Sequence, residues 1–370
     1  MNKKQMTGKS LSKGLAAAWS RYSYIFVFVI ILAVYAVTVF ANGNVFNPRH
    51  ISGILSSQNT VIVGTMAIGM AMVIITGQID LSLGSSLVLC TGVTILSYNA
   101  TGGNALVMIL AALGSGLLCG LLNGVLVGYA KMPPFIVTLG TMLIYRSLTL
   151  SVVREIDPAL TGSSSSQFSM ISDFSSYDFL RMKFGTGSLN LGIIQIPYVT
   201  FLFVALTLVF IFIMGNTKYG KSIYAVGSNA KTAMLTGIHV DRVKVSVFAV
   251  TGLLVGFASF MQACKIGNVT PASSGTSYEM YAIAAVVLGG VNMAGGRGKI
   301  LGVFFGALSY TTINFIIVNI PALSPDIQNT FQGLVLIVVI LIQTAGPVIR
   351  EKFAALRKRA KASNKKEELL

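Results

Sequence analysis

The sequence contains few charged residues. Asp, Glu, Lys and Arg make up 10% of its 370 residues, whereas about a quarter is usual in a soluble domain. The two histidines, His50 and His239, are isolated residues between apolar segments. No Walker lysine motif is present, and no series of acids and histidines is suited to relay protons. We therefore expect no enzymatic activity in this chain, and no metal or cofactor of its own.

Cysteine is also scarce. The three cysteines, Cys90, Cys119 and Cys264, lie in or at the edge of apolar stretches and form no Cys-x-x-Cys pair. Buried free cysteine behaves as a small apolar residue, so we interpret all three as core residues. Neither a disulfide framework nor a cysteine metal site is expected.

Hydrophobic residues, by contrast, make up 54% of the chain. A helix that spans a membrane needs about 20 predominantly apolar residues. Ten apolar segments are predicted to be membrane helices, one of them short: 24–41, 54–75, 83–98, 104–129, 135–153, 196–214, 245–264, 278–290, 300–320 and 327–345. The predicted fold class is therefore an all-α polytopic membrane protein, with residues 24–348 as its transmembrane domain.

The net charge of +16 is concentrated in the termini and in certain loops. A nucleic-acid-binding protein would gather such charge on one face, and membrane topology explains this distribution better. By the positive-inside rule, the segments 1–23, 215–244 and 349–370 are predicted to lie in the cytoplasm. The loop 154–195 is rich in Gly and Ser and nearly neutral, so it is predicted to be external. We expect contact with membrane lipids and no nucleic-acid partner.

The second apolar segment runs into TGQIDLSLGSS, residues 76–86, whose Gly and Ser residues interrupt the helix. Asp80 within it is costly at membrane depth, by about 2.5–3.5 kcal/mol, so it needs water or partners. Ser82 and Ser85 are suited to cap the next helix, with Asp80 near its positive N-terminus. Two interpretations stay open. Asp80 is a structural cap at the cytoplasmic rim, or it serves the pathway or its gate.

The segment 278–290 has 13 residues, which is too short to cross the hydrocarbon core. A Gly-dense segment, 291–299, follows and ends with Arg297 and Lys299, which indicate the inside. We predict a short or re-entrant helix joined to irregular backbone, which a membrane tolerates only where protein or water surrounds it. Glu279 is expected at the outer, N-terminal end of this helix.

A stripe of small residues is predicted in the segment 104–129. Gly116, Gly120 and Gly124 recur every four residues, a spacing that lets two helices pack closely. Asn123 lies beside this stripe and is expected to hydrogen-bond to a neighbouring helix.

The basic loop 215–244 contains the signals of a short helix. Ser228 is suited to be its N-cap, residues 230–236 can form two turns, and Gly237 suits the stop. This segment is either a connector with an incidental helix or a docking surface for a cytoplasmic partner. Because nothing in the chain supplies energy for transport, a separate ATPase is the natural partner.

Four stretches, in order, carry a resemblance to a known family. They are TGQIDLSLGS (76–85), PPFIVTLGTMLIYRSL (133–148), KYGKSIYAVGSNAKTAMLTGIHVDRVK (218–244) and YEMYAIAAVVLGGVNMAGGRGKILG (278–302). Over about residues 24–348 the chain resembles the permease subunits of bacterial ABC importers for monosaccharides, the ribose, galactose and xylose group. It departs from the family pattern at the loop 154–195, which looks longer than usual, and at Gln78, where many relatives have Gly.

The resemblance implies the ABC importer permease fold, in the bacterial inner membrane, with both termini in the cytoplasm. It implies that two permease copies, identical or related, pair on two ATPase subunits that bind ATP and magnesium. An extracytoplasmic sugar-binding protein would deliver the sugar. The helix of the 215–244 loop would couple transport to ATP hydrolysis, and the matching residues are Ser228, Asn229, Ala230, Ala233, Met234, Leu235 and Gly237.

A sugar carries hydroxyls and no charge, so its path should be weakly polar and should release it readily. The candidates for this path are Asp80, Ser82, Asn123, Thr138, Thr141, Glu279 and Asn292. The alternative for each is a structural hydrogen bond between helices, worth about 0.6 kcal/mol. An importer permease for a nucleoside or a furanosyl signal molecule is the alternative function. A membrane scaffold or receptor without transport is the alternative of another class.

Overall fold

The computed structural model describes residues 23–320, except 58, 164, 165, 191 and 193, together with six separate residues between 330 and 341. The chain divides into two compact units, Met1–Asn319 and Ile320–Leu370, and the first is described below. The predicted terminal segments 1–23 and 349–370 and the last predicted span, 327–345, fall almost entirely outside the described residues. They therefore stay predictions.

Seven helices of the described part are long and apolar enough to cross a membrane. They are Ser23–Ala41, α4 (Leu83–Ala100), α5 (Ala105–Gly128), α6 (Pro134–Glu155), α9 (Tyr198–Asn216), α12 (Val240–Ile266) and α14 (Ile300–Val318). An eighth span results if α2 (Pro48–Ser56) and the helix formed by η1 (Asn59–Val63) and α3 (Gly64–Ile75), bent by 51° at their break, count as one. The prediction of an all-α polytopic membrane protein is confirmed. The predicted count of ten spans is not reached among the described residues.

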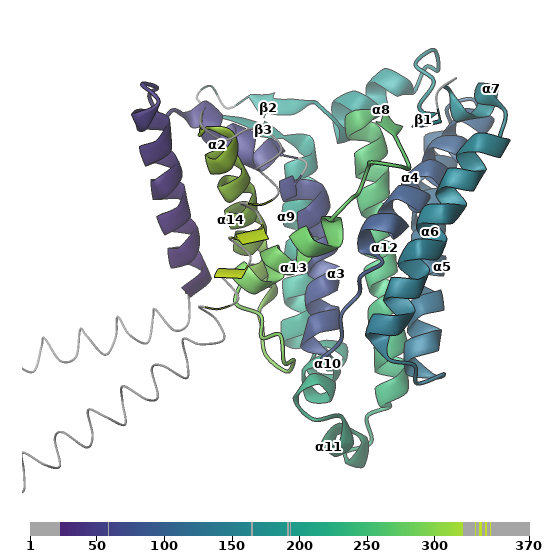
Figure 1. The fold of residues 1–370 in the computed structure, drawn as a ribbon, viewed down its shortest axis with the longest axis vertical. Helices are drawn as coiled ribbons and strands as arrows, with labels where there is room; N and C mark the ends of the chain where they lie inside the picture. The colour runs from purple at the N-terminus through teal and green to yellow at the C-terminus, as the bar shows by residue number, and fades with distance from the viewer. Residues whose placement is uncertain are drawn as a thin grey trace, which may run out of the picture. The chain divides into compact units, whose positions relative to one another are not determined.

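Helix α3 lies at the centre of the first unit. All twelve of its residues are buried, and it packs against α12, α13 and α14 (Figure 1). Its sequence, GTMAIGMAMVII, has almost no polar residue, as expected for a helix that protein surrounds on every side. From the buried end of α3 the chain passes directly into the irregular segment 76–82.

Helices α5 and α12 pack through glycine. A Cβ added at Gly116 would overlap the carbonyl oxygen of Gly252, and one added at Gly120 would overlap that of Phe248. At Gly124 an added Cβ would lie 2.8 Å from the carbonyl oxygen of Val245. Backbones can approach this closely only because small residues line the contact. The predicted stripe of small residues is therefore confirmed, and its partner is α12.

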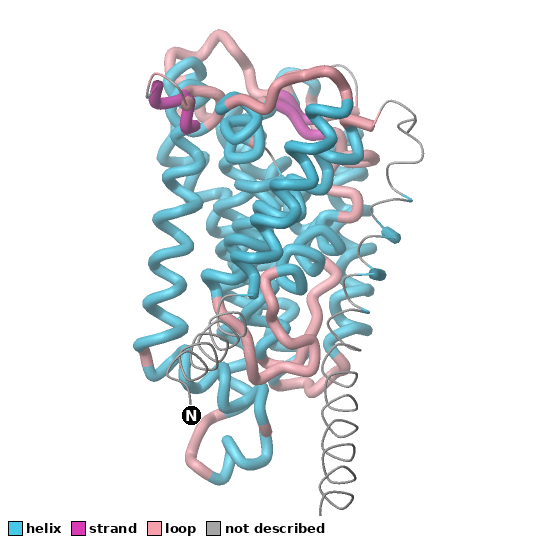
Figure 2. The backbone as a smooth tube through the Cα atoms, turned by 90° about the vertical axis from the view of Figure 1, so that its left-hand side faces the viewer, coloured by secondary structure: helices cyan, strands magenta, loops and turns pink. Residues whose placement is uncertain are grey.

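The two ends of the bundle carry different elements (Figures 1 and 2). At one end lie α7 (Pro158–Thr161), α8 (Tyr177–Phe184) and four short strands: β1 (Phe168–Ser169), β2 (Ser188–Asn190), β3 (Gln195–Pro197) and β4 (Asn268–Val269). Strand β1 pairs antiparallel with β4, and β2 pairs with β3. At the other end lie α10 (Lys218–Ser228) and α11 (Ala230–Leu235). The segment 154–195 thus forms short helices and strands, and its external position stays a prediction.

Helix α13 (Tyr278–Leu288) has only 11 residues, which confirms the predicted short helix. At 1.5 Å per residue its length is about 16 Å, roughly half of the hydrocarbon core. Irregular backbone precedes and follows it, and such backbone lies within the height of the bundle (Figure 2). Because α14 and α3 pack against α13, protein surrounds this broken region, as its polar backbone groups require.

Candidate functional site

A buried chain of polar side chains joins the segment 76–82 to α5. The Asp80 carboxylate oxygen Oδ1 accepts hydrogen bonds from the Ser82 backbone N–H, at 2.9 Å, and from the Ser82 hydroxyl, at 2.6 Å. The Asn123 side-chain amide donates to the same Ser82 hydroxyl at 2.9 Å. Asp80, Ser82 and Asn123 are 3%, 1% and 1% exposed. The predicted interhelical hydrogen bond of Asn123 is therefore confirmed, and its partner is Ser82.

The capping arrangement at the start of α4 differs from the expected one. Ser82 occupies the N-cap position, but its side chain makes no cap hydrogen bond. Its hydroxyl oxygen instead accepts from the Asn123 amide and from the Ser86 hydroxyl, and its proton is donated to Asp80. Ser85 donates its hydroxyl to the Ser82 carbonyl oxygen at 2.9 Å and lies within the helix. Asp80 itself receives a backbone N–H at the helix N-terminus, where the helix dipole favours a negative charge.

Glu279 lies close to Asp80 rather than at the opposite rim of the membrane domain. Its carboxylate adjoins Gly84, the second residue of α4, where an added Cβ would lie 2.5 Å from Glu279 Oε2. The segment before α13 packs against the start of α4, where a Cβ added at Gly275 would lie 2.7 Å from the Gly84 carbonyl oxygen. Arg146 of α6 anchors this segment, since its guanidinium donates to the carbonyl oxygens of Pro271 and Ser274, both at 2.7 Å.

Three buried polar side chains, one each in the segment 76–82, α5 and α6, have atoms without a partner among the described residues. The Asn123 amide oxygen, the Thr138 hydroxyl and both amide atoms of Gln78 find no hydrogen-bond partner among the described residues. Gln78 is 5% exposed and Thr138 is fully buried. Thr141, one turn further along α6, donates to the Thr138 carbonyl oxygen at 3.3 Å. Buried polar atoms usually have partners, so these are available to water or to a solute.

The remaining path candidate, Asn292, lies in the loop between α13 and α14. It is exposed, and its amide oxygen accepts from the Ala294 N–H at 3.0 Å, which closes a local turn. The structure thus brings Asp80, Ser82, Asn123 and Glu279 together around the start of α4. The side chain of Asn292 instead makes its hydrogen bond within the loop between α13 and α14.

The predicted helix of the 215–244 loop is present as α11. Its N-cap is Asn229, whose side-chain oxygen accepts from the Thr232 N–H at 3.0 Å, so the prediction of Ser228 as the cap is wrong. Ser228 instead ends the preceding helix, α10. Gly237 stops α11 as predicted, with φ of +86°. Its N–H donates to the Met234 carbonyl oxygen at 3.0 Å, part of a Schellman motif.

The side chains of α11 divide into a packed face and an outward face. Ala233 is 3% exposed and packs inward, whereas Met234 is 59% and Leu235 87% exposed. Ser228 and Asn229 are also exposed, and Ala230 is half-buried. A helix end that presents two large apolar side chains to solvent is typical of a surface that another protein covers.

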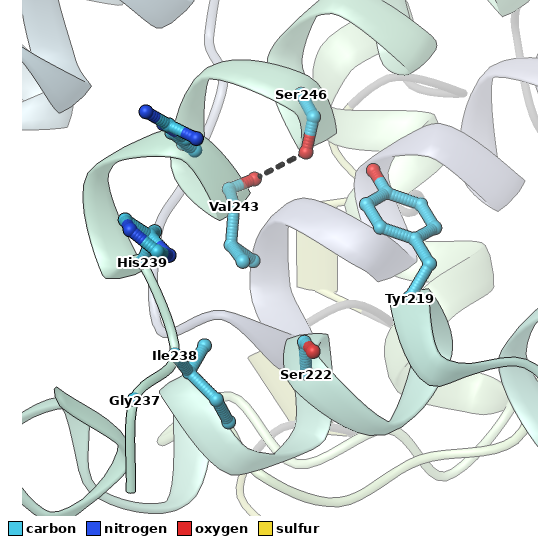
Figure 3. Close-up of a pocket in the computed structure, with 8 residues that line it drawn as sticks. Tyr219, Ser222, Gly237, Ile238, His239, Val243 and Ser246 are labelled. Atoms are coloured by element: carbon cyan, nitrogen blue, oxygen red, sulfur yellow. Dashed lines mark hydrogen bonds between the residues drawn. The ribbon is translucent and has the colours of Figure 1, made fainter. Parts of the chain in front are cut away.

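A pocket adjoins α11 on the side of α12 (Figure 3). Tyr219 and Ser222 of α10 line one side of it, and the start of α12 lines the other. The Ser246 hydroxyl donates to the Val243 carbonyl oxygen at 2.9 Å, and Arg242 is exposed at the edge. The pocket lies in the same basic segment as α11, and Gly237 and Ile238, which follow α11, also line it.

Sequence reasoning missed two elements of the site. Helix α10 was read as part of a loop, although Gly220, Ile223 and Val226, its buried residues, recur every three positions. The anchoring role of Arg146 was also missed, because its partners are backbone carbonyl oxygens more than 120 residues away. The first could have been found from hydrophobic periodicity, and the second carries no local signal.

Comparison with known proteins gives a family. No solved structure matches the chain. The ribose import permease protein RbsC of Escherichia coli strain K12 is 33% identical over 85% of this chain and 91% of its own length. RbsC of Bacillus subtilis strain 168 is 34% identical, over 86% and 90%. The xylose transport system permease protein XylH of Escherichia coli strain K12 is 32% identical, over 78% and 84%.

These similarities agree with the four sequence motifs. The resemblance to permease subunits of bacterial ABC importers for monosaccharides is therefore confirmed. Residues 51–340 match the family described as branched-chain amino acid transport system / permease component. This range contains α3 to α14, including the irregular segment 76–82 and the irregular backbone on either side of α13. This protein belongs to that family of transport system permease components.

Proposed function

We propose that this chain is the membrane-spanning permease subunit of an ATP-driven importer that carries a monosaccharide across a bacterial inner membrane. The observation that carries the proposal is its 33–34% identity to two ribose import permeases over most of both chains. The neutral polar groups at the start of α4 support it, because they suit a solute with hydroxyls and no charge.

The path of the sugar runs past the break at 76–82. Asn123, Thr138 and Gln78 offer a buried carbonyl oxygen, a hydroxyl and an amide without internal partners. Such groups exchange hydrogen bonds with sugar hydroxyls or with water at little net gain, so they conduct the sugar without trapping it. Asp80 and Glu279 flank this region and, in the proposal, hold its geometry.

Energy comes from a separate ATPase subunit, which binds ATP and magnesium and docks on α11. The exposed Met234 and Leu235 supply the apolar contact. The basic residues of the segment, opposed only by Asp241, attract an acidic rim on the partner. Asp241 is itself engaged by Lys131, whose ammonium nitrogen lies 3.1 Å from its carboxylate.

Two further partners complete the assembly. An extracytoplasmic binding protein docks on the end that carries α7, α8 and the strands. A second permease copy, identical or related, pairs in the membrane with an exposed apolar face such as that of α5 and α6, where Leu118 is 69% and Leu143 62% exposed. Lipid covers the apolar faces that remain.

The function is tested by reconstituting the chain with the ATPase and binding protein of its own host in proteoliposomes. We expect ATP-dependent uptake of at least one of labelled ribose, xylose and galactose. Uptake of uridine and of none of the sugars would show that the substrate is a nucleoside instead. ATP-dependent uptake of none of these solutes, from a complex that binds ATPase, would refute the proposal.

The orientation is tested with single cysteines at Ser172 and Lys231, both exposed, at opposite ends of the bundle. The native cysteines are all buried, so they serve as the unlabelled background. With an impermeant maleimide we expect label at position 172 in intact spheroplasts and at 231 only after lysis. The reverse pattern would invert the topology.

A further inference from the structure

The last turn of α10 meets the end of α3 in a close backbone contact at Gly227. A Cβ added at Gly227 would overlap the carbonyl oxygen of Ile75, the last residue of α3, and would lie 2.8 Å from the Gly296 nitrogen. The exposed loop between α13 and α14 completes the contact, because the Gly296 N–H donates to the same Ile75 oxygen at 2.8 Å. Carbonyls at a helix end lack partners within the helix, and here a distant loop supplies one.

Neighbouring residues tighten the same junction. The Tyr224 hydroxyl of α10 donates to the Gly298 carbonyl oxygen at 2.9 Å. Burial raises the pKa of Tyr224, so its hydroxyl remains protonated and able to donate at neutral pH. A Cβ added at Gly295 would lie 3.1 Å from both the Gly227 carbonyl oxygen and the Gly77 Cα. We call this contact of Gly227, Ile75 and Gly296 the glycine joint.

The glycine joint touches both broken regions of the membrane domain. On one side, Ile75 immediately precedes the segment 76–82, which contains Asp80 and leads to the start of α4. On the other, Gly296 lies in the loop that connects α13, with Glu279 in its first turn, to α14. Helix α10 is in turn joined to α11 by a single residue, Asn229, which is the C-cap of one helix and the N-cap of the other.

We propose that the glycine joint transmits displacement of α11 to both broken segments at once, and that Gly227 is its central positioning residue. The proposal rests on the docking of an ATPase at α11. Backbone that touches backbone contains no side chain whose rotamer change could absorb a movement, and packed protein is hard to compress. A push on α11 therefore shifts the end of α3 and the loop after α13 together.

The test is Gly227→Ala in the assembled complex of permease, ATPase and binding protein. The added methyl group separates α10 from α3 and leaves the outward face of α11 unchanged. We expect the ATPase to co-purify and its basal rate to stay as in the wild type. Sugar uptake, and the uptake per ATP hydrolysed, should fall about tenfold. Tyr224→Phe, which removes one hydrogen bond and adds no atom, should lower both by about threefold.

Gly215→Ala is the matched control, because Gly215 lies in the last turn of α9 with nothing near its Cβ position. It should behave as the wild type. If Gly227→Ala proves too unstable to assemble, Tyr224→Phe decides. If the variant that assembles shows wild-type sugar uptake per ATP hydrolysed, the proposal is refuted. It is also refuted if a stable, folded variant no longer binds the ATPase, because the proposal predicts lost coupling with intact binding. Failure of the proposed docking is separate, since Leu235→Asp would then leave ATPase binding intact.

Discussion

Two of the close glycine contacts in the described part of this permease differ in what surrounds them. The contact of α5 with α12 joins two continuous helices along Gly116, Gly120 and Gly252. The glycine joint instead connects a helix end to two irregular segments, at Ile75 and Gly296. The first contact repeats over several turns and resists any relative movement. The second is a single point, and the backbone beyond it on two sides is not helical.

The same chemistry thus serves two purposes. Close packing along two regular helices builds a rigid body, because each turn repeats the constraint. Close packing at one point passes motion on, because the segments beyond it can bend. Substitutions in the contact of α5 with α12 should therefore prevent folding. Substitutions in the glycine joint should reduce only the coupling of sugar uptake to ATP hydrolysis. The predictions below are arranged to break or sharpen this contrast.

The largest effect is expected for Gly120→Leu in α5. The new side chain has no room against Phe248 of α12, where even a Cβ would overlap the carbonyl oxygen. Overpacking of this kind costs about 1–3 kcal/mol or more, so the unfolding temperature in detergent should drop and assembly and uptake should be lost together. Gly114→Leu, on the open side of the same helix, is the control and should retain both. A stable Gly120→Leu variant that loses uptake alone would abolish the contrast.

The next largest effect is expected for Leu235→Asp on α11, the helix whose displacement the glycine joint is proposed to transmit. Leu235 is 87% exposed, so the change leaves the fold intact and removes an apolar contact with the ATPase. Binding of the ATPase to the detergent-solubilised permease should weaken about tenfold or more. Ala233→Arg is a less clean probe, because Ala233 is buried and the change would disturb α11 itself.

The matched control is Leu189→Asp, at an exposed leucine of the opposite end. It should leave ATPase binding as in the wild type. Equal weakening by both substitutions would show a general effect of the added charge, and the assignment of α11 as the docking helix would fall.

Much of the fold could be predicted from sequence, because the membrane imposes strong local rules. Apolar runs located the membrane-spanning helices of the described part to within a few residues at most ends, and the Gly spacing in α5 identified its packing face. Gly237 was recognised as a stop, since a left-handed residue after a short helix has a clear signature. These features depend on residues that are near one another in the chain.

The rest depends on contacts between distant segments. Ser228 and Asn229 are both good N-caps, and in the structure α10 continues to Ser228 while its last turn packs against the end of α3. Glu279 was placed at the outer rim because nothing local reveals that Arg146 draws the preceding segment inward. The partners of Gly227 are about 150 and 70 residues away in sequence, so the glycine joint has no signal in a single sequence.

The smallest effect is expected for Asp80→Asn, in the segment 76–82 that the glycine joint is proposed to move. Asparagine keeps an oxygen that can accept from the Ser82 N–H and hydroxyl, so the cap of α4 survives while the charge near Glu279 disappears. Stability and ATPase binding should be unchanged, and uptake should fall about threefold if the charge takes part in the path. Asp80→Ala is the control for the cap, because it removes both hydrogen bonds and should cost about 1 kcal/mol in stability. Wild-type uptake by Asp80→Asn, with destabilisation by Asp80→Ala, would leave Asp80 a helix cap. The path would then rest on the neutral groups of Asn123, Thr138 and Gln78 alone.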